Sequence, residues 1–96
     1  MNKPASVEDI VRGVSRYLRL NPLASDTLGG ITQWWLRSMT VIPDDLERAL
    51  AVLEGAGLVT ATHAADGQVH YRRSALTARV DAELDRFAAG GPADDA

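Results

Sequence analysis

The chain has 96 residues, which is enough for one domain with a single modest core, and 46% of them are hydrophobic. It contains no cysteine, so disulfides and thiolate chemistry are excluded. The formal net charge of −3 argues against a nucleic-acid partner, although a local basic patch stays compatible with it. No apolar run is long enough to span a membrane, and the N-terminal MNKPASVED lacks the apolar core of a signal peptide. We therefore expect a cytoplasmic protein.

The first predicted helix follows a short polar start. Ser6 and Asp9 have the spacing of a capping box, and Asn21-Pro22 stops the helix. The apolar residues between them follow a 3.6-residue period: Val7, Ile10, Val11, Val14, Tyr17 and Leu18. The outer face aligns three cations in a stripe: Arg12, Arg16 and Arg19. This stripe predicts a solvated face, with an acidic partner or a phosphate surface as the alternative.

A second helix is predicted to start at Asp26 or Thr27, both of which are good N-cap residues, and to end near Arg37. Gly29 and Gly30 lower its intrinsic helix propensity, so we expect them to permit close backbone packing. Three apolar residues share one side of this helix: Leu28, Ile31 and Trp35.

Two adjacent tryptophans, Trp34 and Trp35, point about 100° apart on a helix, so they cannot face the same spot. We assign Trp35 to the core and place Trp34 at the edge of the core. Trp34 is then either a partly buried packing residue or an exposed contact anchor.

A third helix is predicted from Pro43 to Gly55. Pro43 suits the first turn, and the two aspartates after it favour the positive end of the helix dipole. The 3,4-spaced apolar residues Leu46, Ala49, Leu50 and Leu53 form its buried face. Gly55 and Gly57 end the helix, because glycine adopts a left-handed conformation without steric cost.

A hairpin follows the third helix. Residues 58–63 and 69–73 read as two strands, and Asp66-Gly67 is a strong signal for the turn between them. Residues 40–42 are a candidate short first strand of the same sheet. If the turn has two residues, His63 lies directly opposite His70. A shared metal ion is then conceivable but further ligands are lacking, and a longer turn would separate the two histidines.

A fourth helix, capped by Ser74, is predicted to close the chain before Gly90-Gly91-Pro92. Its buried stripe consists of Leu76, Val80, Leu84 and Phe87. The expected organisation is thus a flexible N-terminus over residues 1–5, a single domain over residues 6–89 and a disordered tail over residues 90–96.

This order of elements, with the pattern LERALAVLEGAGLV, DG and YRR, resembles the winged helix-turn-helix family over residues 6–87. The resemblance implies a mainly α fold with a small antiparallel β-hairpin wing. The implied order is two helices, a short strand, the third helix, the two wing strands and a fourth helix. The family includes transcription regulators, and other members use the scaffold to dock proteins. In DNA-binding members the N-terminal face of the third helix enters the major groove.

That face is acidic in this chain, since Asp44, Asp45 and Glu47 accompany a single cation, Arg48. Our first hypothesis is therefore a protein-interaction or regulatory adaptor that uses these four residues together with Trp34. The alternative is a DNA-binding transcriptional regulator, whose wing would contact DNA, or a protein partner, through four residues: Gln68, His70, Arg72 and Arg73. A third hypothesis is a homodimer built on the first and fourth helices.

No catalytic constellation is recognisable. The chain has no Gly-rich phosphate loop, no GxSxG and no HExxH, and its serines lack a histidine and an acid in register. We expect neither enzymatic activity nor a cofactor.

Overall fold

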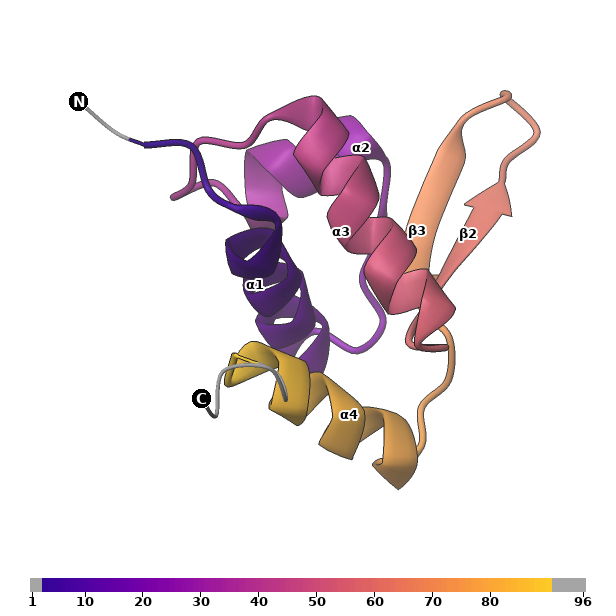
Figure 1. Cartoon of the computed structure of the whole chain (residues 1–96). Helices are drawn as coiled ribbons and strands as arrows, with labels where there is room; N and C mark the ends of the chain where they lie inside the picture. Colours follow the sequence, from indigo (N-terminus) through magenta and orange to yellow (C-terminus); the bar gives the residue numbers. More distant parts are fainter. Residues whose placement is uncertain (1–2, 91–96) are drawn as a thin grey trace.

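The computed structural model describes residues 3–90 and has a mixed α/β architecture of four α-helices and a small three-stranded antiparallel sheet (Figure 1). In chain order the elements are α1 (Val7–Leu20), β1 (Ser25–Asp26), α2 (Leu28–Gly30), a π-helical stretch η1 (Ile31–Trp35), α3 (Pro43–Gly55), β2 (Val59–His63), β3 (Val69–Arg73) and α4 (Ala78–Ala88). Within the described range, no helix combines the length and apolar character needed to cross a bilayer.

The capping box predicted for the first helix is confirmed. The Ser6 hydroxyl accepts a 3.0 Å hydrogen bond from the Asp9 amide, and the Asp9 carboxylate accepts one of 3.1 Å from the Ser6 amide. These two bonds are the main reason why the pKa of Asp9 lies below its ordinary value, with Arg12 adding a smaller effect. At the other end, the Asn21 amide donates to the Tyr17 carbonyl and α1 stops there.

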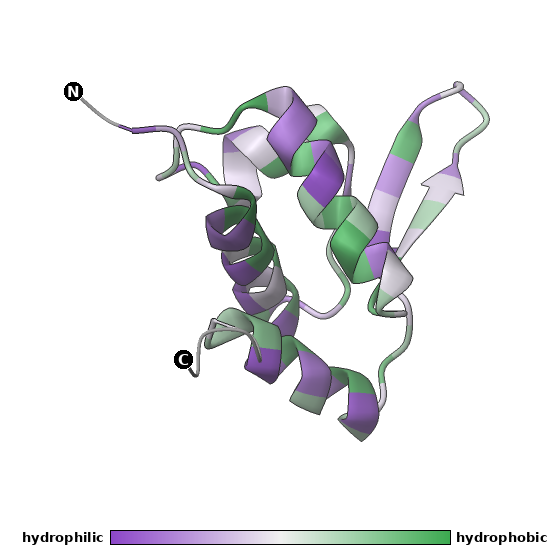
Figure 2. Cartoon of the chain, in the orientation of Figure 1, coloured by the Kyte–Doolittle hydropathy of each residue, from purple (hydrophilic) through white to green (hydrophobic). Residues whose placement is uncertain are grey.

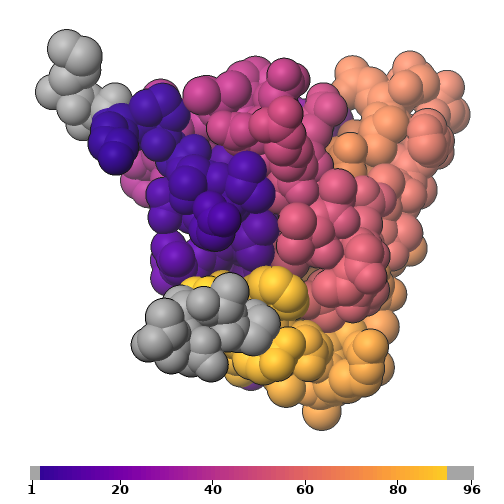
Figure 3. All heavy atoms as spheres, viewed as in Figure 1, coloured from indigo at the N-terminus to yellow at the C-terminus, as the bar shows by residue number. Residues whose placement is uncertain are grey.

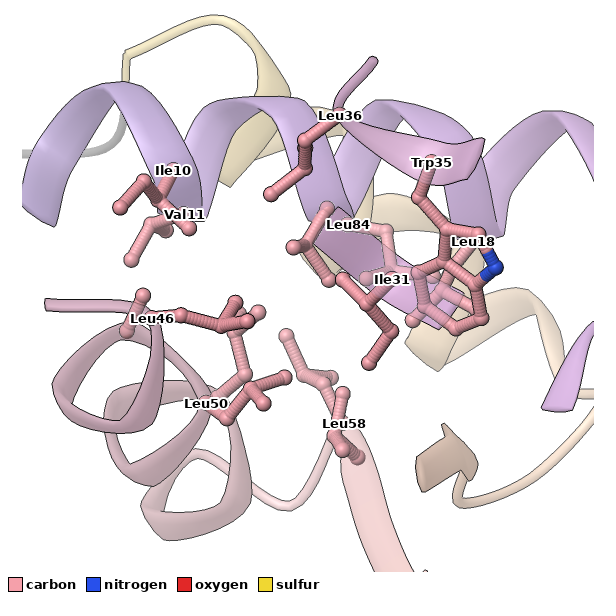
Figure 4. Close-up of a cluster of buried hydrophobic side chains, with 14 of the residues drawn as sticks. Ile10, Val11, Leu18, Ile31, Trp35, Leu36, Leu46, Leu50, Leu58 and Leu84 are labelled. Atoms are coloured by element: carbon pink, nitrogen blue, oxygen red, sulfur yellow. The ribbon is translucent and has the colours of Figure 1, made fainter. Parts of the chain in front are cut away.

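The core lies between α1 and the two helices that pack against it, α3 and α4, and Figure 4 shows side chains from these helices and η1 converging on it. The predicted apolar faces of α1 and α3 are buried, with Ile10, Val14, Leu46 and Leu50 at most 1% exposed. Figure 2 shows hydrophilic residues on the sides of the same helices that face away from the core. Burial of these apolar helix faces removes them from water and thereby stabilises the fold.

The short first strand of the sheet is not where we expected it. Residues 40–42 are not a strand. Instead the first strand, β1, precedes α2, and Ser25 pairs with Arg72 on the side of the central strand β3 that faces away from β2. The Thr40 carbonyl accepts a 2.8 Å hydrogen bond from the Ala5 amide, so this connection binds the N-terminal segment rather than the sheet. The predicted element order is thus wrong at this point.

The predicted turn at Asp66-Gly67 exists, but it is longer than two residues. Gly67 has a φ of +85°, the Gly67 amide donates to the Ala64 carbonyl, and the Ala64 amide donates to the Gln68 carbonyl. This three-residue loop pairs His63 with Val69 and Thr62 with His70. His63 and His70 thus belong to successive pairs and point to opposite faces of the hairpin, so the structure has the longer turn, the alternative that separates the two histidines.

The fourth helix begins later than predicted. Its N-cap is Thr77, whose hydroxyl accepts from the Val80 amide, whereas the Ser74 hydroxyl shares a 2.7 Å hydrogen bond with Thr60 of β2. Leu76 therefore precedes the helix and is 64% exposed, which removes it from the predicted stripe. Val80 and Leu84 are buried and Phe87 is half-buried, as expected. The predicted tail beyond Gly90 lies outside the described residues.

Close backbone packing was predicted at Gly29 and Gly30, but the close neighbour found at Gly30 is a side chain, and Gly29 has no such neighbour. A Cβ on Gly30 would lie 1.8 Å from Oδ1 of Asp26, the oxygen that accepts a hydrogen bond from the Thr27 amide. We expect Gly30→Ala to lower the free energy of unfolding by about 1–3 kcal/mol in urea denaturation, because the Asp26 carboxylate must move. Gly29→Ala is the matched control and should be neutral or stabilising by up to about 1 kcal/mol. Equal effects would refute the role of Asp26.

Candidate interaction surfaces

The exposed face of α3 carries an acidic stripe that we define as Asp44, Glu47 and Glu54. Spacings of three and seven residues place these carboxylates on one side of the helix, and all three are exposed. The N-terminal part of the stripe, with Arg48 and Ala51, lines a shallow hollow of about 320 Å³. Figure 3 shows that α3 is open to solvent between α1 and the hairpin. Nothing in the described chain covers this face.

Arg48 does not neutralise the acidic stripe. Its guanidinium lies 3.1 Å from the Asp45 carboxylate in an i,i+3 pair. Asp45 itself is mostly buried, so of the four residues predicted on this helix it contributes least to the accessible surface. The exposed carboxylates of Asp44, Glu47 and Glu54 leave this face of α3 with a net negative charge.

Tyr71 shows which side of the sheet faces the acidic stripe. Burial is the main cause that raises its pKa above the ordinary value, and the negative charges of Glu54 and then Glu47 raise it further. Tyr71 pairs with Asp26 and Ala61 in the middle of the sheet. The stripe therefore borders the helix-facing side of β3.

The two tryptophans have the separate roles that their angular offset implies. Trp35 is only 9% exposed and its ring stacks on Tyr17, with centroids 4.8 Å apart and planes 9° from parallel. Trp34 is 55% exposed. The assignment of Trp35 to the core is confirmed, and Trp34 presents a large apolar surface to solvent.

The outward side of the sheet carries a different chemistry. His70 and Arg72 alternate with the inward residues of β3, and with Ser25, Thr62 and Ala64 they line an open hollow of about 320 Å³. Gln68 is exposed at the turn, where its backbone amide donates a hydrogen bond to the Asp66 carboxylate. These wing residues and the acidic stripe therefore lie on opposite sides of the sheet, so the two predicted sets do not form one surface.

Arg73 does not belong to the exposed wing. Its side chain is 3% exposed, its guanidinium lies 2.8 Å from the Asp81 carboxylate of α4, and its Nε donates to the Ala75 carbonyl. The prediction that Arg73 contacts DNA or a partner is thus contradicted by its burial. The alternation of β3 turns this residue inward, where it meets an acid of the following helix, α4.

The predicted cationic stripe of α1 is divided between two environments. Arg19 pairs with Asp85 at 3.1 Å, so it ties α1 to α4. Arg12 and Arg16 instead line a hollow of about 760 Å³ with residues of the N-terminal segment and of the connection before α3: Lys3, Pro4, Ala5, Ser38, Met39 and Thr40. This hollow was not predictable from the sequence, because its walls come from three separate segments.

The helices proposed for a homodimer are largely occupied within the chain. α1 and α4 lie against each other (Figure 1), and apolar residues of both helices belong to the buried core. Three apolar side chains within or close in sequence to these helices are exposed: Leu20 at the end of α1, Leu23 just after it and Leu76 just before α4. A dimer through these helices stays a prediction and would have to use such residues.

Comparison of this chain with known protein families, with curated proteins and with solved structures gave no match in any of the three. Among residues 3–90, no three histidine, aspartate or glutamate side chains are grouped as metal ligands would be.

Proposed function

We propose that this chain is a non-catalytic winged-helix adaptor that binds a basic segment of a partner protein on the acidic stripe of α3. The observation that carries the proposal is the exposure of Asp44 and Glu47 at the N-terminal end of α3, the end that DNA-binding members of the winged-helix family turn toward phosphates. Glu54 is exposed on the same side of the helix and extends the negative charge toward its C-terminal end. The order of two helical segments, a third helix, a hairpin and a fourth helix supports the winged-helix resemblance.

Electrostatics favours a cationic partner over DNA. Each exposed carboxylate repels backbone phosphates and attracts lysine or arginine side chains. The single cation of α3, Arg48, is already paired with Asp45. Burial of Arg73 leaves Arg72 as the exposed arginine of the hairpin. Trp34 adds an exposed aromatic side chain of the type that anchors protein interfaces.

The proposal is tested with a short peptide of alternating lysine and glycine, measured by calorimetry at low salt. The double variant Asp44→Asn/Glu47→Gln should weaken binding about tenfold, since each exposed charge contributes roughly 0.5–1 kcal/mol. Glu8→Gln/Glu83→Gln is the matched control, because it removes the same charge from α1 and α4. Equal weakening by both variants would mean that only net charge matters, and the assignment to α3 would fail.

A DNA-binding regulator is the second candidate, favoured by the outward hollow in which Arg72 and His70 accompany the hydroxyls of Ser25 and Thr62. This candidate predicts affinity for duplex DNA of mixed sequence. That affinity should fall steeply as the salt concentration rises and should be lowered by Arg72→Ala. Our proposal expects no such binding near physiological salt. A steep salt dependence that Arg72→Ala reduces would replace the adaptor with the regulator.

A further inference from the structure

We propose that the hollow between the N-terminal segment, α1 and residues 38–40 binds a small molecule that carries adjoining phosphate groups. The hollow measures about 760 Å³, within the range of sites that hold small ligands. It lies apart from the acidic stripe of α3 and shares no lining residue with it.

The charges that line this hollow are predominantly positive. Lys3, Arg12 and Arg16 contribute three cations against one carboxylate, that of Asp9, which gives a surplus of two positive charges. Asp9 is already engaged, since it accepts hydrogen bonds from the Ser6 amide and from Nη1 of Arg12 at 2.9 Å. Its lowered pKa keeps it ionised at neutral pH. Arg12 retains other guanidinium N–H groups, and Arg16 forms no ion pair within residues 3–90.

The walls of the hollow are held in place by the fold. The 2.8 Å hydrogen bond from the Ala5 amide to the Thr40 carbonyl joins the N-terminal segment to the connection before α3. A Cβ on Gly13 would lie 2.9 Å from Cε of Met39 and 2.8 Å from Cδ2 of Leu36. Glycine at this position therefore lets Met39 lie close against α1.

The lining combines anion-binding and apolar groups in the way that a small organic phosphate requires. Pro4, Ala5, Gly13 and Met39 supply apolar surface, and Ser38 and Thr40 supply hydroxyls beside the three cations. A compact ligand experiences chiefly this local positive charge. An extended polyanion would also meet the carboxylates of α3 and the net charge of −3, which oppose it.

ADP is the probe for this site, with adenosine as the matched compound that lacks phosphate. In amide NMR spectra of the full chain, ADP should shift the signals of Gly13, Arg16 and residues 38–40, and adenosine should not. Arg16→Gln should weaken ADP binding about tenfold, the effect of one charge-assisted contact of roughly 1.5 kcal/mol. Arg79→Gln is the matched control, because it removes an exposed arginine outside the hollow.

Three results would overturn the proposal: equal shifts with ADP and adenosine, shifts confined to other parts of the chain, or equal weakening by Arg16→Gln and Arg79→Gln. Duplex DNA would also overturn the proposal if it abolished the ADP-induced shifts at a concentration below that of ADP. The hollow would then be a nucleic-acid site. Because Asp44→Asn/Glu47→Gln leaves the hollow intact, it should not change ADP binding. The two proposals can therefore fail independently.

Discussion

Trp35→Ala is expected to lower the free energy of unfolding by about 3–4 kcal/mol, whereas Trp34→Ala should lower it by no more than about 1 kcal/mol. Trp35 is 9% exposed and stacks on Tyr17, so its truncation leaves a cavity and an unstacked ring. Trp34 is 55% exposed, so its truncation removes less buried apolar area than the truncation of Trp35 does. Urea denaturation of the two variants beside the parent chain measures both effects.

The same pair of variants bears on the proposed function. If Trp34 contributes to the docking surface, Trp34→Ala weakens binding of a basic peptide while the chain remains folded. Fluorescence supplies a control, because the remaining tryptophan of Trp34→Ala should emit at shorter wavelength than that of a folded Trp35→Phe variant. A large stability loss in Trp34→Ala would show that this side chain packs into the core, and its assignment as a contact residue would be wrong.

Asp81→Asn is expected to destabilise the chain by about 2–3 kcal/mol, more than Arg73→Met, for which we expect about 1 kcal/mol. The difference follows from what each change leaves behind. Asp81→Asn leaves the buried Arg73 guanidinium without its carboxylate, 2.8 Å away in the parent chain. Arg73→Met removes the buried charge and leaves Asp81, which is 38% exposed and lies 3.9 Å from Arg19. Thermal and urea unfolding of both variants tests the order.

Asp85→Asn is the control for this comparison. Asp85 pairs with Arg19 at 3.1 Å, but both side chains are well exposed, so we expect a change below about 0.5 kcal/mol. A larger cost for Arg73→Met than for Asp81→Asn would mean that the packing of the arginine stem outweighs its charge. The ion pair would then not be what joins β3 to α4.

Features that depend on neighbouring residues were predictable from the sequence. The Ser6 and Asp9 capping box involves groups three residues apart, and the buried faces of α1 and α3 follow from helical spacing. The start of α3 at Pro43 and its end at Gly55 match the predicted bounds. The acidity at the start of α3 was visible for the same reason, but Glu54 of the acidic stripe was not among the predicted site residues.

Features that depend on pairing between distant segments were not predictable. The loop of the hairpin has three residues rather than two, and this one difference separates His63 from His70. The strand β1 was not predicted, because nothing near Ser25 in the sequence indicates its partner Arg72. Arg73 looked like a surface cation because Asp81, which pairs with it, lies in the next helix.

The amino-acid sequence by itself determined the helical stripes, their caps and the acidity of the α3 face, because each is a periodic or local property of the chain. Only the tertiary structure decided which cations are accessible. Arg73 is buried against α4, Arg48 is paired on its own helix, and Arg12 and Arg16 border a hollow that three segments enclose. The reason is physical: whether a charge is available to a ligand depends on burial and on partners brought close by folding, and neither is a local property.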